Sequence, residues 1–331
     1  MSRSLTLIAP QIAPSLTRAI AQRSARWPTL ARLAGRGAIR ELPLADVGNG
    51  LQRWQLALLE ALHLHDPSEY PSAAVTRSGD IDGRAGGFWM HALPMHFVAG
   101  LDRLTAVMLR GDTRVTHAER AELEPTIAAH MRSAGFELRR TEADEWLVHS
   151  NVPMDVLMAP PEQAVAAPLT EMMPRGRDAG VVRRLMTELQ MLLHEHPVSV
   201  RRVQRGVPEV NAIWFHGAGA LHDPQRHSLP QAFGSDAYLR GIYRLNDLAV
   251  TGAPADAKAL LGRLQSRAVA VVDADDLDML EVLWLAPLTR PLVAGVITRL
   301  DVVLDRWQIA APRGALLKVW RAQRNPGEWL A

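Results

Sequence analysis

Five residues near the middle of the chain combine side-chain types that could bind a small anionic ligand. They offer an amide, a stacking face, a titratable ring and a G-x-G pattern: Asn211, Trp214, His216, Gly217 and Gly219. Backbone amides bared by glycine bind phosphate where a strand turns into a helix. The third glycine of a dinucleotide-binding fingerprint is missing, because position 222 is His222. We therefore expect either a ligand site at the end of a strand or a tight turn beside a core tryptophan.

A second group of polar residues follows the apolar run 268–272, and consists of Asp273, Asp275, Asp276 and Asp278. Their oxygens could hold a divalent cation, or they could cap a helix that begins near Leu277. The predicted ligand site combines Asp273 with the five residues above. A metal-dependent alternative would use Asp273, Asp275, His216 and His222.

The motif His194-Glu195-His196 invites a metal assignment, but its spacing argues against one. Residues two apart on a helix point about 200° away from each other, so both rings cannot face one ion. It also differs from H-E-x-x-H, whose two histidines share one helix face. We expect a helix C-terminus, where a cationic histidine offsets the helix dipole and Pro197 turns the chain.

The stretch 181–219 sets out the elements that would position these groups. Apolar residues at helical spacing predict an amphipathic helix from Val181 to His196. After an arginine-rich connector, Val210 to Phe215 reads as a buried strand that the glycines break. Helix, loop, strand and glycine turn make an α/β unit with a site at the strand's carboxyl end. Further buried strands are predicted at Leu5–Ala9 and Ala268–Val272.

Residues 70–160 differ in pattern and predict an inserted α+β subdomain, leaving 1–69 and 161–331 as the α/β main domain. The insertion contains an antiparallel strand pair, a helix with a capping box at Thr116, and a hairpin: Phe88–Met95 with Leu104–Leu109, 116–133, and Phe136–Arg140 with Glu145–His149. Here His91, His96 and Asp102-Arg103 could line a polar pocket or belong to an ordinary sheet surface. Residues 158–177 predict a linker, 220–235 a polar loop, and Leu300–Ala310 a hairpin turning at Asp305-Arg306. Helices are expected from Ser15 and over Leu51–Leu64, Ala237–Leu248, Ala257–Ser266 and Leu277–Leu285.

The composition is that of a globular protein, with 48% hydrophobic and 22% charged residues and a formal charge of +2. Cysteine is absent, which excludes disulfides, thiolate nucleophiles and cysteine-ligated metals. No run reaches the 18 or so apolar residues that span a bilayer, so we expect a cytoplasmic protein with no membrane partner. Arginine makes up nearly all of the basic residues, a bias more typical of a GC-rich genome than of a nucleic-acid surface. A weaker hypothesis places nucleic acid on the arginine connector.

Two segments carry a family resemblance, HALPMHFVAGLDRL and LQMLLHEHPVSVRRVQRGVPEVNAIWFHGAG. They resemble the bacterial regulatory protein RpfE family, which is described as similar to the cofactor-independent phosphoglycerate mutases. The resemblance implies the alkaline-phosphatase fold, an α/β sheet flanked by helices, and for active mutases two metal ions. Such mutases place a metal-binding aspartate after strand one, where this chain has Ala9-Pro10, and they use a serine nucleophile with late Asp and His ligands that this sequence does not show.

The expected function is therefore that of a non-catalytic regulatory or ligand-binding relative of these mutases. We expect no catalytic residues, no metal and no cofactor, and either a small ligand or a regulatory protein as the partner. The alternative is a metal-dependent phosphoryl transferase or hydrolase with rearranged ligands.

Overall fold

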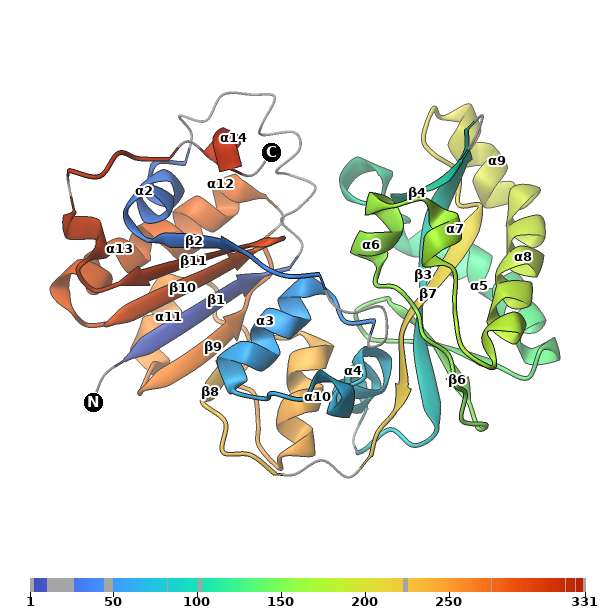
Figure 1. Ribbon diagram of the computed structural model, residues 1–331, viewed down its shortest axis with the longest axis horizontal. Helices are drawn as coiled ribbons and strands as arrows, with labels where there is room; N and C mark the ends of the chain where they lie inside the picture. Colours follow the sequence, from blue (N-terminus) through green and yellow to red (C-terminus); the bar gives the residue numbers. More distant parts are fainter. Residues whose placement is uncertain are drawn as a thin grey trace. The chain divides into compact units, whose positions relative to one another are not determined.

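The computed structural model describes residues 3–10, 27–44, 50–81, 83–100, 103–222, 226–274, 276–318, 320–324 and 326–329. The chain divides into two compact units (Figure 1). Unit 1 comprises Met1–Pro43, Arg53–His65 and Arg226–Ala331, and unit 2 comprises Leu44–Gln52 and Asp66–Gln225. In the described part of the chain, no helix has the length and apolar character needed to cross a membrane. The helix predicted from Ser15 falls outside the described residues.

Unit 1 is built on a six-stranded mixed sheet in the order β2-β11-β10-β1-β9-β8. Its central strand β1 is parallel to both β10 and β9, and β9 is parallel to β8. The strands are β1 (Ser4–Ala9), β2 (Ala38–Glu41), β8 (Gln231–Phe233), β9 (Arg267–Val271), β10 (Arg299–Leu304) and β11 (Trp307–Pro312). The runs predicted as buried strands, Leu5–Ala9 and Ala268–Val272, are thus confirmed as strands. The structure adds that they are neighbours in one sheet. Such apolar runs suit parallel strands because both of their faces are covered.

Helices cover both faces of this sheet (Figure 1). The larger core lies on the face that receives Leu5, Leu7 and Ala9. The elements packed there are α2 (Pro28–Arg36), α11 (Ala257–Arg263), α12 (Leu277–Met279), the π-helix Leu280–Leu285 and α13 (Ala286–Ala294). On the other face, α3 (Arg53–Leu62) packs against β1, β9 and β10, and its Trp54 contacts Tyr238 of α10 (Ala237–Leu245) edge to face. The helices predicted around α3, α10, α11 and α12 are confirmed.

The hairpin β10–β11 turns at Asp305-Arg306 as predicted, with Asp305 in the left-handed region at φ 49°. Aspartate tolerates this conformation better than most residues. The region predicted as a polar loop, 220–235, is only partly a loop, because β8 pairs with β9 inside it. A strand of three residues is too short to show an alternation of apolar and polar residues in the sequence. Only its pairing with β9 in the folded chain reveals it.

Unit 2 contains an entirely antiparallel sheet in the order β4-β3-β6-β5, with β7 paired to β3. Its long strand β3 (Phe88–Ala99) pairs with β4 (Leu104–Met108), β6 (Trp146–Ser150) and β7 (Ala212–Ala220), and β5 (Glu137–Arg140) completes the sheet. The predicted strand pair and the predicted hairpin are confirmed. Helix α5 (His117–Ser133) begins at the predicted capping box, in which Thr116 and Glu119 bond each other's backbone amides.

Helix α8 (Ala179–His194) supplies the apolar stripe that the sequence predicts. Val182, Leu185, Leu189 and Leu193 are buried in the core of unit 2 together with residues of α5. Residues 70–160 therefore share one core with α8 and β7, and unit 2 continues to Gln225.

Two segments predicted to be irregular are helical, and these predictions were wrong. Residues 158–177 contain α6 (Pro161–Ala166) and α7 (Leu169–Met172), and the arginine connector contains α9 (Pro197–Gln204). Proline caused both errors. Pro161 and Pro197 stand in the first turn of their helices, where proline is favoured because no intrahelical amide bond is lost there.

Candidate functional site

Strand β7 carries four of the six predicted site residues and directly follows a fifth, Asn211, but its glycines do not break it. Gly219 lies opposite Trp89 of β3, and Gly217 lies within β7 where the register with β3 is irregular, between Trp89 and His91. A Cβ on Gly217 would lie 2.7 Å from Cβ of Ser72, and a Cβ on Gly219 would lie 2.5 Å from Cβ of Pro71. The glycines therefore let the start of α4 (Ser72–Asp80) approach the strand closely. The predicted strand-to-turn phosphate nest is thus corrected to a close contact between a helix and a strand.

His216 belongs to a buried polar cluster with His91 and Ser72. His91 and His216 are register partners on β3 and β7, and their rings stack 4.7 Å apart at 10°. His91 Nε2 lies 3.0 Å from Ser72 Oγ. The side chain of His216 is 3% exposed, and its Nδ1 has no hydrogen-bond partner. The cluster therefore places two imidazoles and a hydroxyl group in the interior of unit 2.

Burial keeps both rings neutral. It lowers the pKa of His91 to about 4, opposed by a hydrogen bond with Ser72. The pKa of His216 lies well below its usual range, mainly because the ring is buried and secondly because His91 repels a positive charge. A hydrogen bond with the backbone of Gly50 acts in the opposite direction and raises this pKa. A neutral imidazole can accept a proton or a hydrogen bond, so the cluster has the chemistry of a base held away from water.

Asn211 and Trp214 have structural partners. The Asn211 amide accepts a hydrogen bond from Phe97 N at 2.7 Å and donates one to Phe97 O at 2.9 Å, in the manner of a strand residue. Trp214 is 1% exposed and donates from Nε1 to Ala159 O at 3.0 Å. Both side chains thus hold β7 in the core of unit 2.

Asp273 lies in unit 1, at the carboxyl end of β9, and is exposed. The pKa of Asp236, which caps α10, is raised mainly by burial and in part by Asp273. Asp276 caps α12 by accepting a hydrogen bond from Met279 N at 2.7 Å, as predicted for this acidic run. Asp275 falls outside the described residues, and among the described ones no group of three or more Asp, Glu or His side chains could hold a metal ion.

The histidines of His194-Glu195-His196 belong to different helices. His194 ends α8 with its side chain 74% exposed, whereas His196 is buried and caps α9 by accepting a hydrogen bond from Val198 N. The expected helix C-terminus therefore falls at His194, whereas His196 begins the next helix and its pKa is lowered by burial. A surface pocket of about 430 Å³ is lined by the exposed side of α8 and by Asn211: Thr187, Gln190, Met191, His194, Glu195 and Asn211.

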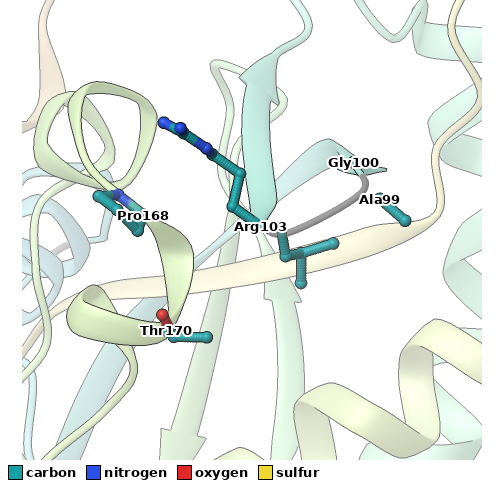
Figure 2. A pocket seen from close by; sticks show the side chains of 6 residues that line it. Ala99, Gly100, Arg103, Pro168 and Thr170 are labelled. Atoms are coloured by element: carbon teal, nitrogen blue, oxygen red, sulfur yellow. The ribbon is translucent and has the colours of Figure 1, made fainter.

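A second pocket of unit 2, of about 560 Å³, lies beside the β3–β4 connection (Figure 2). It is lined by Ala99, Gly100, Arg103, Leu104, Pro168 and Thr170. Of the residues considered together for a polar pocket, Arg103 lines this one, His91 lies in the buried cluster with Ser72, and Asp102 falls outside the described residues. Arg103 is its cationic lining side chain, so an anionic ligand would suit this pocket best.

The arginines of the connector are engaged within unit 2. Arg202 is 1% exposed and donates from Nη1 to Glu119 Oε2 at 2.8 Å. Arg205 bonds the other oxygen of Glu119, and Arg201 pairs with Glu122. Ion pairs of this kind hold α9 against α5, which removes much of the charge that the nucleic-acid hypothesis needs.

Replacing Arg202 with methionine should lower the free energy of unfolding by about 2 kcal/mol. A buried carboxylate that loses a charged partner is costly, and Glu119 would keep Arg205 as its ion-pair partner and Thr116 as its hydrogen-bond partner. Urea denaturation followed by circular dichroism measures the change. The matched control is Arg201→Met, whose ion pair is half exposed and should contribute less than about 1 kcal/mol. Equal effects of the two substitutions would contradict a special role for Arg202.

Sequence reasoning missed Ser72 and the pairing of His91 with His216. Ser72 and His216 are 144 residues apart along the chain, and only the packing of α4 on β7 brings them together. The available signal was the alternation of Gly217 and Gly219, which marks a strand face approached by another element.

Comparisons with known proteins relate part of this chain to one enzyme family. No protein-family model matches it. It is 37% identical over 76 residues to a 2,3-bisphosphoglycerate-independent phosphoglycerate mutase of Methanothrix thermoacetophila, which covers 23% of this chain and 19% of the mutase. A probable mutase of the same type from Geobacter sulfurreducens is 30% identical over 88 residues, covering 27% of this chain and 22% of that protein.

Among solved structures, the cofactor-independent phosphoglycerate mutase of Thermoplasma acidophilum aligns with 97% of this chain and 93% of its own, at 14% identity and a TM-score of 0.40. The sequence matches span about a fifth of each curated mutase. Over those segments the chain is similar to the cofactor-independent phosphoglycerate mutases, which supports a relationship to their superfamily.

Proposed function

We propose that this protein is a non-catalytic relative of the cofactor-independent phosphoglycerate mutases that binds a small ligand or a regulatory partner in the cytoplasm. The likeness to regulatory protein RpfE is part of this proposal. The proposal as a whole rests on one observation, which concerns the carboxyl end of β1. Val272 N donates to Ile8 O at 2.9 Å, so the ends of β1 and β9 lie side by side in unit 1. There Ala9, which is 1% exposed, takes the position where the mutases are expected to carry a metal-binding aspartate.

An alanine at this position offers no oxygen ligand, and loss of a ligand weakens the charge stabilisation on which phosphoryl transfer depends. Three of the predicted site residues are occupied within unit 2. Trp214 and Asn211 are engaged with backbone groups, and His216 is buried. For the ligand we propose an anion in the pocket lined by Arg103, because that side chain brings a positive charge to it.

The test is an assay of phosphoglycerate mutase activity with Mn²⁺, Mg²⁺ or Zn²⁺, together with elemental analysis of the purified protein. We expect turnover at the background rate, while the Methanothrix enzyme, assayed in parallel, provides the positive control. Stoichiometric metal together with turnover that is lost in Asp273→Ala would overturn the proposal.

That outcome would favour the second candidate, a metal-dependent phosphoryl transferase. Its predicted ligands are Asp273, Asp275, His216 and His222, of which Asp273 belongs to unit 1 and His216 to unit 2.

A further inference from the structure

The described residues 313–318 and 320–324 of unit 1, the basic strap, expose two large apolar side chains. Trp320 is 78% exposed and Leu317 is 55% exposed, whereas the preceding Ala315 and Leu316 are buried in the core of unit 1. Single exposed apolar residues are common, but a tryptophan beside a leucine on one short segment is a feature of interaction surfaces.

The basic strap is fixed to α2 on both sides of these residues. Before them, Arg36 Nη1 donates to Leu316 O at 2.7 Å. After them, Arg324 N donates to Ala31 O at 3.2 Å, and Gly35 lies directly against Ala322 O. Between the two anchors a turn closes from Arg321 N to Lys318 O at 3.0 Å. Trp320 therefore stands in a turn whose backbone is held in place before any partner arrives.

Along the sequence, the charged residues just before and just after Trp320 have one sign. From Arg306 to Arg324 the sequence contains no Asp or Glu but five basic residues: Arg306, Arg313, Lys318, Arg321 and Arg324. Arg321 and Arg324 are exposed and Lys318 is partly exposed. The basic strap thus combines an aromatic ring, an aliphatic side chain and a local excess of positive charge.

We propose that the basic strap binds the surface of an anionic phospholipid membrane. Tryptophan is enriched at the interface between headgroups and acyl chains, leucine gains from burial among acyl chains, and each nearby Lys or Arg adds attraction to anionic headgroups. A nucleic acid would stack its bases on Trp320 and bind its phosphates to the basic side chains, but it would gain little from contact with Leu317. Surface binding requires no spanning helix, and the sequence-based expectation of no membrane partner considered only spanning segments.

The experiment is co-sedimentation of the full chain with vesicles of phosphatidylcholine alone and of phosphatidylcholine with 30% phosphatidylglycerol (about one lipid in three, as in many bacterial-membrane mimics). We expect binding to the anionic vesicles only, with a shift of tryptophan emission to shorter wavelength. Trp320→Ala should abolish the emission shift, and Arg321→Gln should weaken partitioning about fivefold. The matched controls are Val282→Ala and Arg290→Gln, which alter exposed residues of the same unit outside the basic strap.

Three results would overturn the proposal. They are no binding of the wild-type chain to anionic vesicles, unchanged binding of Trp320→Ala, and equal losses in the control variants. Retention on single-stranded polynucleotide but not on vesicles, with the same dependence on Trp320, would assign the basic strap to nucleic acid instead. The vesicle assay is independent of the mutase assay, so either proposal can fail without the other.

Discussion

Substitution of Gly217 by valine is expected to lower the free energy of unfolding of unit 2 by about 4 kcal/mol. Two costs add. The backbone of Gly217 has φ +62°, a conformation that a β-branched residue adopts only under strain. A Cβ there would also lie 2.7 Å from Cβ of Ser72 and 3.0 Å from Cδ2 of His91. The start of α4 would have to move off β7, so the contact of His91 with Ser72 would be lost as well.

Urea denaturation followed by tryptophan fluorescence measures this effect, because Trp89 and Trp214 lie on β3 and β7. The control is Gly180→Ala in α8, where an added Cβ meets no atom within 4 Å. Alanine should stabilise that helix by about 0.5–1 kcal/mol. A loss below about 1 kcal/mol for Gly217→Val would show that α4 does not pack closely on β7 in solution.

Acidification is expected to destabilise unit 2 between about pH 6.5 and pH 4 through His91 and His216. The pKa of His91 in the folded chain is about 4, below the value of an unfolded histidine. The unfolded chain therefore takes up protons first as the pH falls, and the stability present at neutral pH is lost on the way down. At about 1.4 kcal/mol per pKa unit, His91 alone accounts for about 3 kcal/mol.

His216 should add to this loss, because its pKa lies still further below the usual range. His216→Phe keeps an aromatic ring against His91 but cannot take up a proton, so its urea midpoint should depend less on pH over this range. His194→Gln, which changes an exposed ring of the same unit, should leave the pH dependence of the wild type unchanged. If His216→Phe loses stability with pH as steeply as the wild type, the histidine pair is not the cause.

The local elements could be predicted because neighbouring residues specify them. The capping box at Thr116, the apolar stripe of α8 and the strands β1 and β9 follow from spacing alone, and all are confirmed. Errors arose where one residue type has two uses. Proline begins α6 and α9 instead of ending a segment, and glycine in β7 permits close packing instead of a turn.

The candidate site shows where prediction from the sequence stops. The chain itself determines that residue 216 is a titratable ring on an apolar strand, directly before a glycine, and that the first predicted strand ends at Ala9 without a carboxylate. Only the tertiary structure decides that His216 stacks on His91, that His91 meets Ser72, and that Asp273 belongs to a different unit. The reason is physical. Periodicity reports which face of an element is buried, but which side chains meet there depends on strand register and helix packing across long stretches of chain.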